Sequence, residues 1–138
     1  MRKNVAVTLL VIFSGLSTSA FAQLAKDAAI AKAELVLTNL QSGNIADVAK
    51  EFDARLGKEI PEAKLKPAWS GMLAQFGAFK GIEERREGQM EGRQAVELIL
   101  AFEKDTIVQR VVFDREGKIA GLVFRPKGMA VLPPNKTP

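Results

Sequence analysis

The chain of 138 residues contains no cysteine, no histidine and no tyrosine, and it has a single tryptophan. The absence of cysteine excludes disulfides, thiolate metal sites and thiol nucleophiles. The absence of histidine excludes Ser-His-Asp and Cys-His catalysis and the usual zinc sites. Only Asp, Glu, Lys, Arg, Ser and Thr are left for catalysis, so we expect no metal and no cofactor and predict no catalytic residue.

Glycine-rich phosphate-binding patterns are also missing, because Gly81, Gly88 and Gly92 are too dispersed to surround a phosphate. The spacing of the acidic residues selects no pair for paired-carboxylate chemistry. The residue types and motifs that are present therefore favour a protein that is not an enzyme.

Neither sign of charge is present in large excess. The chain has 20 Lys and Arg against 16 Asp and Glu, and its first 22 residues contribute two of the cations, which leaves 18 against 16. Cations and acids are interleaved, as in residues 83–87, which we interpret as a solvated stretch. No basic face with interspersed aromatic residues is present, so nucleic acid is not an expected partner.

Residues 1–22 have the pattern of a cleavable signal peptide. Arg2 and Lys3 precede an apolar run, and the segment ends in Ala20-Phe21-Ala22, an A-x-A cleavage site. A membrane anchor is the alternative, but the apolar run stops near Leu16 and is shorter than the roughly 20 residues that a spanning helix needs. We therefore predict cleavage after Ala22 and a secreted or periplasmic product that is not held in a membrane.

The remaining residues predict one domain over 23–126. Apolar residues at helical spacing predict a helix over 25–40, a second helix after an Asn44 cap, and a third that begins near Pro67 after a short turn at 61–66. The period then changes to two, which predicts strands over 79–87, 94–102, 106–113 and 119–125. Helices followed by strands indicate an α+β fold with an antiparallel sheet of about four strands.

Two short loops, at 103–105 and at 114–118 with Gly117, predict hairpins between the last three strands. Alternation then predicts the two faces of the sheet. One face carries Leu98, Leu100, Gln109, Val111, Phe113, Ile119 and Val123 and should lie against the helices. The other carries Glu97, Ile99, Val108, Arg110, Val112, Leu122 and Phe124, and it is apolar enough that we expect a second copy of the chain to cover it. Residues 127–138 predict a flexible, proline-rich tail.

Two segments together resemble the domain-of-unknown-function family 3887. They are Leu65, Trp69, Leu73 with Phe76-Gly77-Ala78-Phe79-Lys80, and Val111-Val112-Phe113-Asp114 with Gly117-Lys118-Ile119-Ala120-Gly121-Leu122. The resemblance implies a cone in which helices cover a strongly curved antiparallel sheet, as in nuclear transport factor 2-like, ketosteroid-isomerase-like and cystatin-like folds. It implies no activity. Members often occur beside an α/β-hydrolase domain, so an exported hydrolase is an expected candidate partner.

Trp69, Met72, Phe76 and Gln109 are the candidate ligand-binding residues. The three apolar side chains lie on one side of the third helix and would line a cavity in the cone, with packing in the core as the alternative. Gln109 is the polar residue of the inner face, and it would mark a polar spot in a pocket or lie at a strand edge in water. Glu97 and Arg110 predict a cross-strand pair that stabilises the sheet, with a binding site as the alternative.

These observations predict an exported, non-catalytic domain that binds a small apolar ligand or a protein partner and forms a homodimer through its sheet. The alternative is a small lyase or isomerase that uses a buried carboxyl group in the cone, for which Asp53 and Asp105 are the candidates. A cystatin-like protease inhibitor is less consistent with three helices before the sheet.

Overall fold

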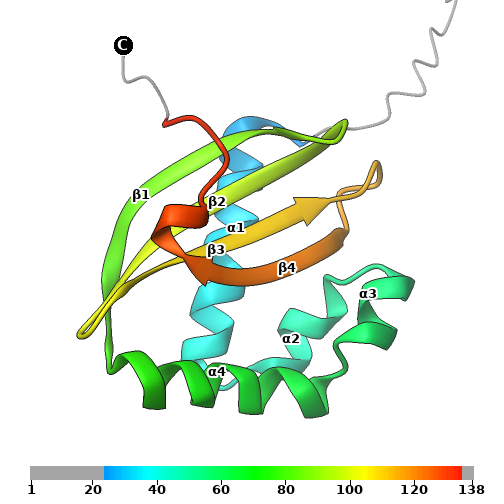
Figure 1. The fold of residues 1–138 in the computed structure, drawn as a ribbon. Coiled ribbons are helices and arrows are strands. Elements are labelled where there is room, and N and C mark those ends of the chain that lie inside the picture. The colour runs from blue at the N-terminus through cyan, green and yellow to red at the C-terminus, as the bar shows by residue number, and fades with distance from the viewer. Residues whose placement is uncertain (1–23, 135–138) are drawn as a thin grey trace, which may run out of the picture.

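The structure is a computed structural model that describes residues 24–134. The predicted signal peptide and the last four residues of the predicted tail lie outside the described residues. Four helices precede one antiparallel sheet with the strand order β1-β2-β3-β4 (Figure 1). The α+β fold with an antiparallel sheet is therefore confirmed. The elements are α1 (Lys26–Ser42), α2 (Ile45–Lys50), α3 (Ala54–Glu59), α4 (Glu62–Phe76), β1 (Phe79–Met90), β2 (Arg93–Phe102), β3 (Thr106–Phe113), β4 (Ile119–Pro126) and the short 3-10 helix η1 (Lys127–Met129).

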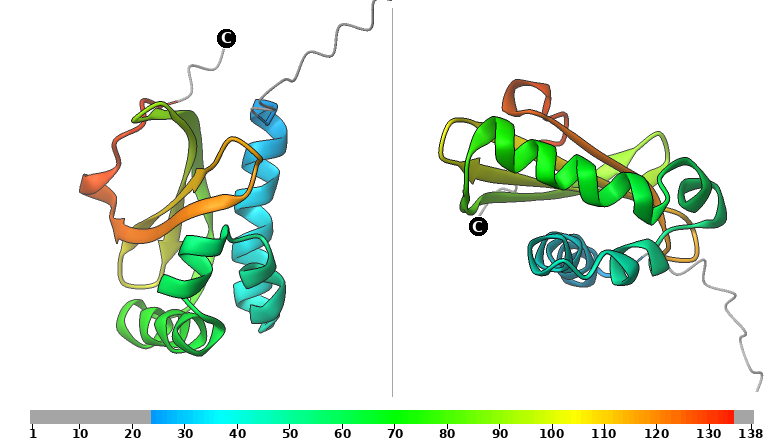
Figure 2. Two further views of the ribbon diagram at one scale, coloured as in Figure 1. Left: turned by 90° about the vertical axis from the view of Figure 1, so that its right-hand side faces the viewer. Right: turned by 90° about the horizontal axis from the view of Figure 1, so that it is seen from below.

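Helix α1 packs along one face of the sheet, and α4 lies at one end of it (Figures 1 and 2). The buried side of α1 consists of the apolar residues that its helical spacing predicts, namely Ala29, Ala33, Val36, Leu37 and Leu40. No helix within residues 24–134 has the length and apolar character needed to cross a membrane.

The other helices differ from the sequence-based boundaries. Helix α4 begins at Glu62 and contains Pro67, whereas the sequence predicted a turn at 61–66. Pro67 removes one helical hydrogen bond, to the carbonyl of Ala63, but Ala63 is exposed and water can replace the donor. Helix α3 was not predicted. It is capped by Asp53, whose side chain accepts a hydrogen bond from the Leu56 backbone N–H at 2.8 Å.

The start of α2 also differs in detail. Asn44 occupies the N-cap position, but its side chain makes no capping hydrogen bond. Its backbone carbonyl instead accepts from the backbone N–H groups of Asp47 and Val48. The predicted position of the helix start is confirmed, and the predicted side-chain cap is wrong.

The hairpins of the sheet follow the turn chemistry. Gly117 has a φ of 79°, in the left-handed region that its loop requires. Strand β1 extends three residues beyond the prediction, because Glu91 and Gly92 both adopt positive φ and form a tight turn into β2. The longer β1 adds Gly88 to the sheet, opposite Ala95 of β2, and Arg86, within the predicted strand, is opposite Glu97.

An irregularity in β4 changes the predicted faces. Phe113 pairs with Ile119, but Val112 pairs with Gly121, so Ala120 is an extra residue in β4. Ile119 also exchanges backbone hydrogen bonds with the segment before α3, accepting from Asp53 and donating to Glu51. The extra residue reverses the alternation, so Leu122 and Phe124 lie on the helix side with the core, and the face prediction for them and for Val123 was wrong.

The core lies between the helices and this inner face of the sheet. It combines the apolar side of α1 with Leu65 and Trp69 of α4 and with alternate residues of β2, β3 and β4, among them Val96, Leu98, Leu100, Phe102, Ile107, Val111, Phe113, Ile119 and Leu122. The opposite, outer face of the sheet faces away from α1 and carries η1 (Figure 2).

Candidate functional site

Three of the four predicted ligand-binding residues lie in an aromatic cluster at the α4 end of the sheet. The Trp69 side chain is 6% exposed, and its ring lies 6.1 Å from the ring of Phe102 and 6.2 Å from that of Phe124. Phe76 lies 6.2 Å from Phe102 on the other side, and Met72 is half-buried against the same core. These distances are typical of packed aromatic pairs.

Gln109, the fourth predicted residue, lies on β3 and is fully buried. Its Nε2 donates to the backbone carbonyl of Ala33 in α1 at 2.9 Å, and its Oε1 has no hydrogen-bond partner among the described residues. The alternative of a strand edge in water is therefore wrong. Gln109 is the register partner of Phe124, which places it beside the aromatic cluster.

Two hollows in the described part of the chain are lined by other residues. One of about 700 Å³ lies between the β1–β2 turn and the β3–β4 loop, with Gln89, Arg93 and Asp114 among its walls. The other, of about 350 Å³, lies between Ile45 and the first turns of α4. Around Trp69 the contacts are between the protein's own side chains.

The outer face contains a row of three charged residues that cross three neighbouring strands. Arg86 of β1 is opposite Glu97 of β2, and Glu97 is opposite Arg110 of β3. The Glu97 side chain is fully buried, and both arginine side chains are 15% exposed. Arg110 donates to Glu97 Oε2 from Nε at 3.1 Å and from Nη2 at 3.0 Å, which confirms the predicted cross-strand pair.

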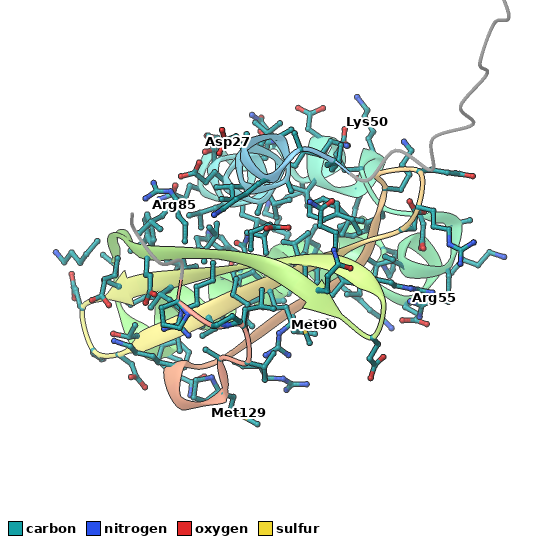
Figure 3. All side chains as sticks on the ribbon, turned by 90° about the horizontal axis from the view of Figure 1, so that it is seen from above. Asp27, Lys50, Arg55, Arg85, Met90 and Met129 are labelled. Atoms are coloured by element: carbon teal, nitrogen blue, oxygen red, sulfur yellow. The ribbon has the colours of Figure 1, made fainter. Side chains whose placement is uncertain are left out.

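The segment that follows β4, residues 127–134, lies on this face and is called the C-terminal strap. Figure 3 shows Met129, at its start, on the side of the sheet away from α1. The backbone N–H of Val131 donates to both oxygens of Glu97, at 3.0 and 3.2 Å, and the backbone N–H of Leu132 donates to Glu97 Oε1. The sequence predicted a flexible tail with little to bury from residue 127; the strap instead contacts the sheet as far as Leu132, which is buried, and Pro133 and Pro134 are exposed.

The two arginines bind carbonyl groups of the same strap. Arg110 Nη2 donates to the Met129 carbonyl at 2.8 Å, and Arg86 Nη1 donates to the Leu132 carbonyl at 3.0 Å. Arg86 also donates two hydrogen bonds to the carboxylate of Glu84, from Nε at 3.0 Å and from Nη2 at 2.9 Å. These bonds lower the pKa of the Glu84 carboxyl group and raise that of the Arg86 guanidinium.

One strap side chain is anchored. Leu132 is 4% exposed, whereas its neighbour Val131 is 58% exposed. A Cβ atom added at Gly88 would lie 3.2 Å from Leu132 Cδ2, so Leu132 occupies space that the missing side chain of Gly88 leaves free. The strand partner of Gly88 is the small residue Ala95, which is itself fully buried.

Together these residues form a site that binds the backbone of a segment outside any strand, which bends at Leu132. All four nitrogen groups that contact Glu97 are donors, so the position requires a group that only accepts hydrogen bonds, as a carboxylate does. The guanidinium groups on either side only donate, and they match the carbonyl groups of the strap. The apolar space over Gly88 that Leu132 fills is called the seat, and it adds a preference for an aliphatic side chain.

Sequence reasoning found only part of this site. The pairing of Glu97 with Arg110 followed from strand alternation. Arg86 was interpreted as part of a solvated charge run, because β1 was predicted to end at residue 87 and no partner strand could be assigned. The strap was missed because proline-rich segments have no periodicity from which their contacts can be inferred.

The candidate carboxyl groups of the alternative function lie elsewhere. Asp53 caps α3 and is half-buried, and Asp105 is exposed and accepts a hydrogen bond from the Thr106 backbone N–H. Glu97 is the one carboxyl side chain of residues 24–134 that is buried.

A family model described as a protein of unknown function (DUF3887) matches residues 33–122, more than half of the chain. The chain belongs to the DUF3887 family. The matched segment runs from α1 into β4 and includes Arg86, Glu97 and Arg110 of the DUF3887 domain, and the strap follows it. Searches of the curated proteins and of the solved structures found no match.

Proposed function

We propose that this DUF3887 protein is an exported, non-catalytic domain that binds a protein partner through the outer face of its sheet. The observation that carries the proposal is the buried carboxylate of Glu97 between Arg86 and Arg110, all three of which contact backbone groups. Burying a charge is costly, and a structure that retains the buried Glu97 carboxylate between two largely covered arginines must satisfy these groups with specific partners. Polypeptide backbone supplies such partners.

Two alternatives have less support. A small apolar ligand would need space near Trp69, where the neighbouring positions are occupied by Phe102, Phe124 and Phe76. A lyase or isomerase would need a carboxyl group with room for a substrate, whereas the buried Glu97 already accepts hydrogen bonds from Arg110, Val131 and Leu132. The predicted homodimer stays a prediction, and the face assigned to it is covered by the chain's own strap.

The cone-shaped fold of nuclear transport factor 2-like proteins is part of the same proposal. It is supported by the helix-then-sheet order, by the bend of the sheet around the helices in Figure 2, and by two register shifts near the start of β1 that bend that strand. In this proposal the interior of the cone is a packed core and the exterior of the sheet is the binding surface.

Export is supported by the sequence pattern of residues 1–22, in which a charged start and an apolar run precede the cleavage site Ala20-Phe21-Ala22. Gln94 Nε2 donates to the Leu24 carbonyl at 2.8 Å, and the Leu24 side chain lies against Gly117. Cleavage after Ala22 would preserve both contacts. Expression with residues 1–22 in an exporting host, followed by mass spectrometry, should give a mature chain that begins at Gln23; a chain that retains its first 22 residues in the membrane fraction would contradict this part.

Partner binding is tested by placing a photo-crosslinking amino acid at position 131, on the outer face, or at position 35, on an exposed part of α1. We expect a discrete adduct with an exported protein from position 131 that disappears in the Arg110→Ala variant, and none from position 35. Equal adducts from both positions, or an adduct that survives Arg110→Ala, would overturn the outer face as the binding surface.

A further inference from the structure

We propose that the outer face is an exchangeable binding site for a bent, non-helical peptide segment with a leucine-like anchor, and that the C-terminal strap is its resident competitor. The inference rests on the proposed function and specifies the partner: a segment with two successive free backbone N–H groups and an aliphatic side chain at the second of them. A partner that presents this segment would displace the strap and take over its contacts.

The way in which the strap is held supports exchange. Its backbone is bound by side chains of the sheet: Glu97 accepts from two N–H groups, and Arg86 and Arg110 donate to two carbonyl groups. Contacts to backbone groups depend little on sequence, so any segment that can adopt the same bend and has no proline at the two donor positions can form them. The strap satisfies this requirement at Val131 and Leu132, and its prolines follow only at 133 and 134.

The side-chain contacts of the strap are few. Leu132 is buried over Gly88, whereas Met129 and Val131 are both exposed. Its ion pair, between Lys127 and Glu83 at 3.7 Å, is half exposed on both sides and contributes little to stability. One apolar anchor and a short set of hydrogen bonds are consistent with a segment that opens while the core stays folded.

The site also selects against incorrect segments. A larger residue than leucine would meet the backbone at Gly88, and an acidic residue there would lie beside Glu97 and away from water. A proline at either donor position would remove the N–H group that Glu97 binds. The expected recognition pattern is therefore any non-proline residue followed by leucine or a residue of similar size.

The experiment uses a fluorescent peptide with the sequence of residues 127–134 and measures its anisotropy with the full chain. In the unaltered chain the strap competes and binding should be weak. The Leu132→Asp variant removes the strap's anchor without changing the sheet, so we expect it to bind the peptide at least 10-fold more tightly. Val131→Asp is the matched control, because its side chain is exposed, and it should bind as weakly as the unaltered chain.

Two further variants test the seat. A peptide with Asp in place of the leucine should not bind the Leu132→Asp chain. Gly88→Val added to Leu132→Asp should also abolish binding, because its side chain fills the seat while Glu97 and both arginines remain. Trp69 fluorescence reports whether the core on the opposite face stays folded in each variant. Absent binding to a folded Leu132→Asp chain, or equal binding of both peptides, would overturn the proposal.

A measurement on the unaltered chain keeps the test independent of variants. The amide protons of Val131 and Leu132 should exchange with solvent at least 10-fold faster than that of Val111 in the central strand β3, through local opening. If all three amide protons exchanged with solvent only at the rate of global unfolding, the proposal that a peptide can displace the strap would be wrong. In that case the adduct at position 131 still decides whether a protein binds over a strap that stays closed, so the two proposals fail separately.

Discussion

The two faces of the sheet are buried in different ways. The inner face is covered by helices whose backbone groups are already paired within each helix, and its buried side chains are apolar apart from the uncharged Gln94 and Gln109. The outer face is equally buried at its centre, where Ile99 and Val108 are fully covered, but it carries the strap, whose residues after η1 belong to no helix or strand. A segment that lies on a sheet, outside any helix and not paired at the sheet edge, has backbone N–H and C=O groups without helical or ladder partners.

That difference explains where the charged residues lie. On the outer face Arg86, Glu97 and Arg110 provide the hydrogen bonds that a neighbouring strand would otherwise supply to the strap. The comparison teaches that the covering element, a helix or an irregular segment, determines how many charged groups the sheet beneath it must provide.

The largest effect is expected on the inner face. Trp69→Ala should lower the free energy of unfolding by about 3–5 kcal/mol, because it removes a buried side chain from contact with Phe102 and Phe124 and leaves a cavity. Urea unfolding measures the change. Leu73→Ala on the same helix, where the side chain is 36% exposed, is the control and should cost less than about 1 kcal/mol. Equal losses would mean that Trp69 does not organise the core.

A smaller but distinct loss is expected for Glu97→Gln. The variant keeps the shape of the side chain but directs an NH₂ group at N–H donors, so buried donors lose their acceptor at a cost of about 1–3 kcal/mol. Urea unfolding and proteolysis within residues 127–134 would both be measured. Glu83→Gln, the same change at an exposed position, should have almost no effect. An unchanged stability for Glu97→Gln would show that the carboxylate is not required.

Gln109→Leu tests whether the inner face needs this polar residue. Leucine has a similar volume, removes the Oε1 atom that lacks a partner and loses the bond to the Ala33 carbonyl. These effects oppose each other, so we expect a change in unfolding free energy below about 1 kcal/mol in either direction. A loss much larger than this would indicate that Gln109 Oε1 has a partner, such as a buried water or a ligand, and would reopen the predicted pocket.

The smallest effect concerns pH. The pKa of Glu84 is lowered from its ordinary value of 4.5, chiefly by its hydrogen bonds to Arg86. The pair therefore contributes stability that is complete above the unfolded value and is lost as the pH falls below 4.5 through the lowered, folded value. The contribution is small, because the side chain is 34% exposed. Glu84→Gln should flatten this part of a plot of unfolding free energy against pH; an identical profile in both chains would contradict the assignment.

Much of the fold could be predicted because its signals are local. The apolar stripe of α1, the bounds of β3 and the loop at Gly117 depend on residues close in sequence, and all three were confirmed. The faces of β2 and β3 were also predicted correctly, because side chains alternate without interruption along both strands. The face of β4 was wrong, because one extra residue at Ala120 reverses the alternation, and its hydrogen bonds to residues 51–53 have no local signal.

For the candidate site, the sequence by itself determined the residue types: no thiol or imidazole chemistry, an aromatic group in α4, and a glutamate and an arginine spaced to face each other across a hairpin. The tertiary structure decided the rest. It brought Arg86 into line with Glu97, and it laid residues 127–134 on the outer face, where a second copy was expected. The physical reason is that a buried charge or an unpaired backbone group is satisfied by partners far along the chain, and a local pattern carries no information about where those partners lie.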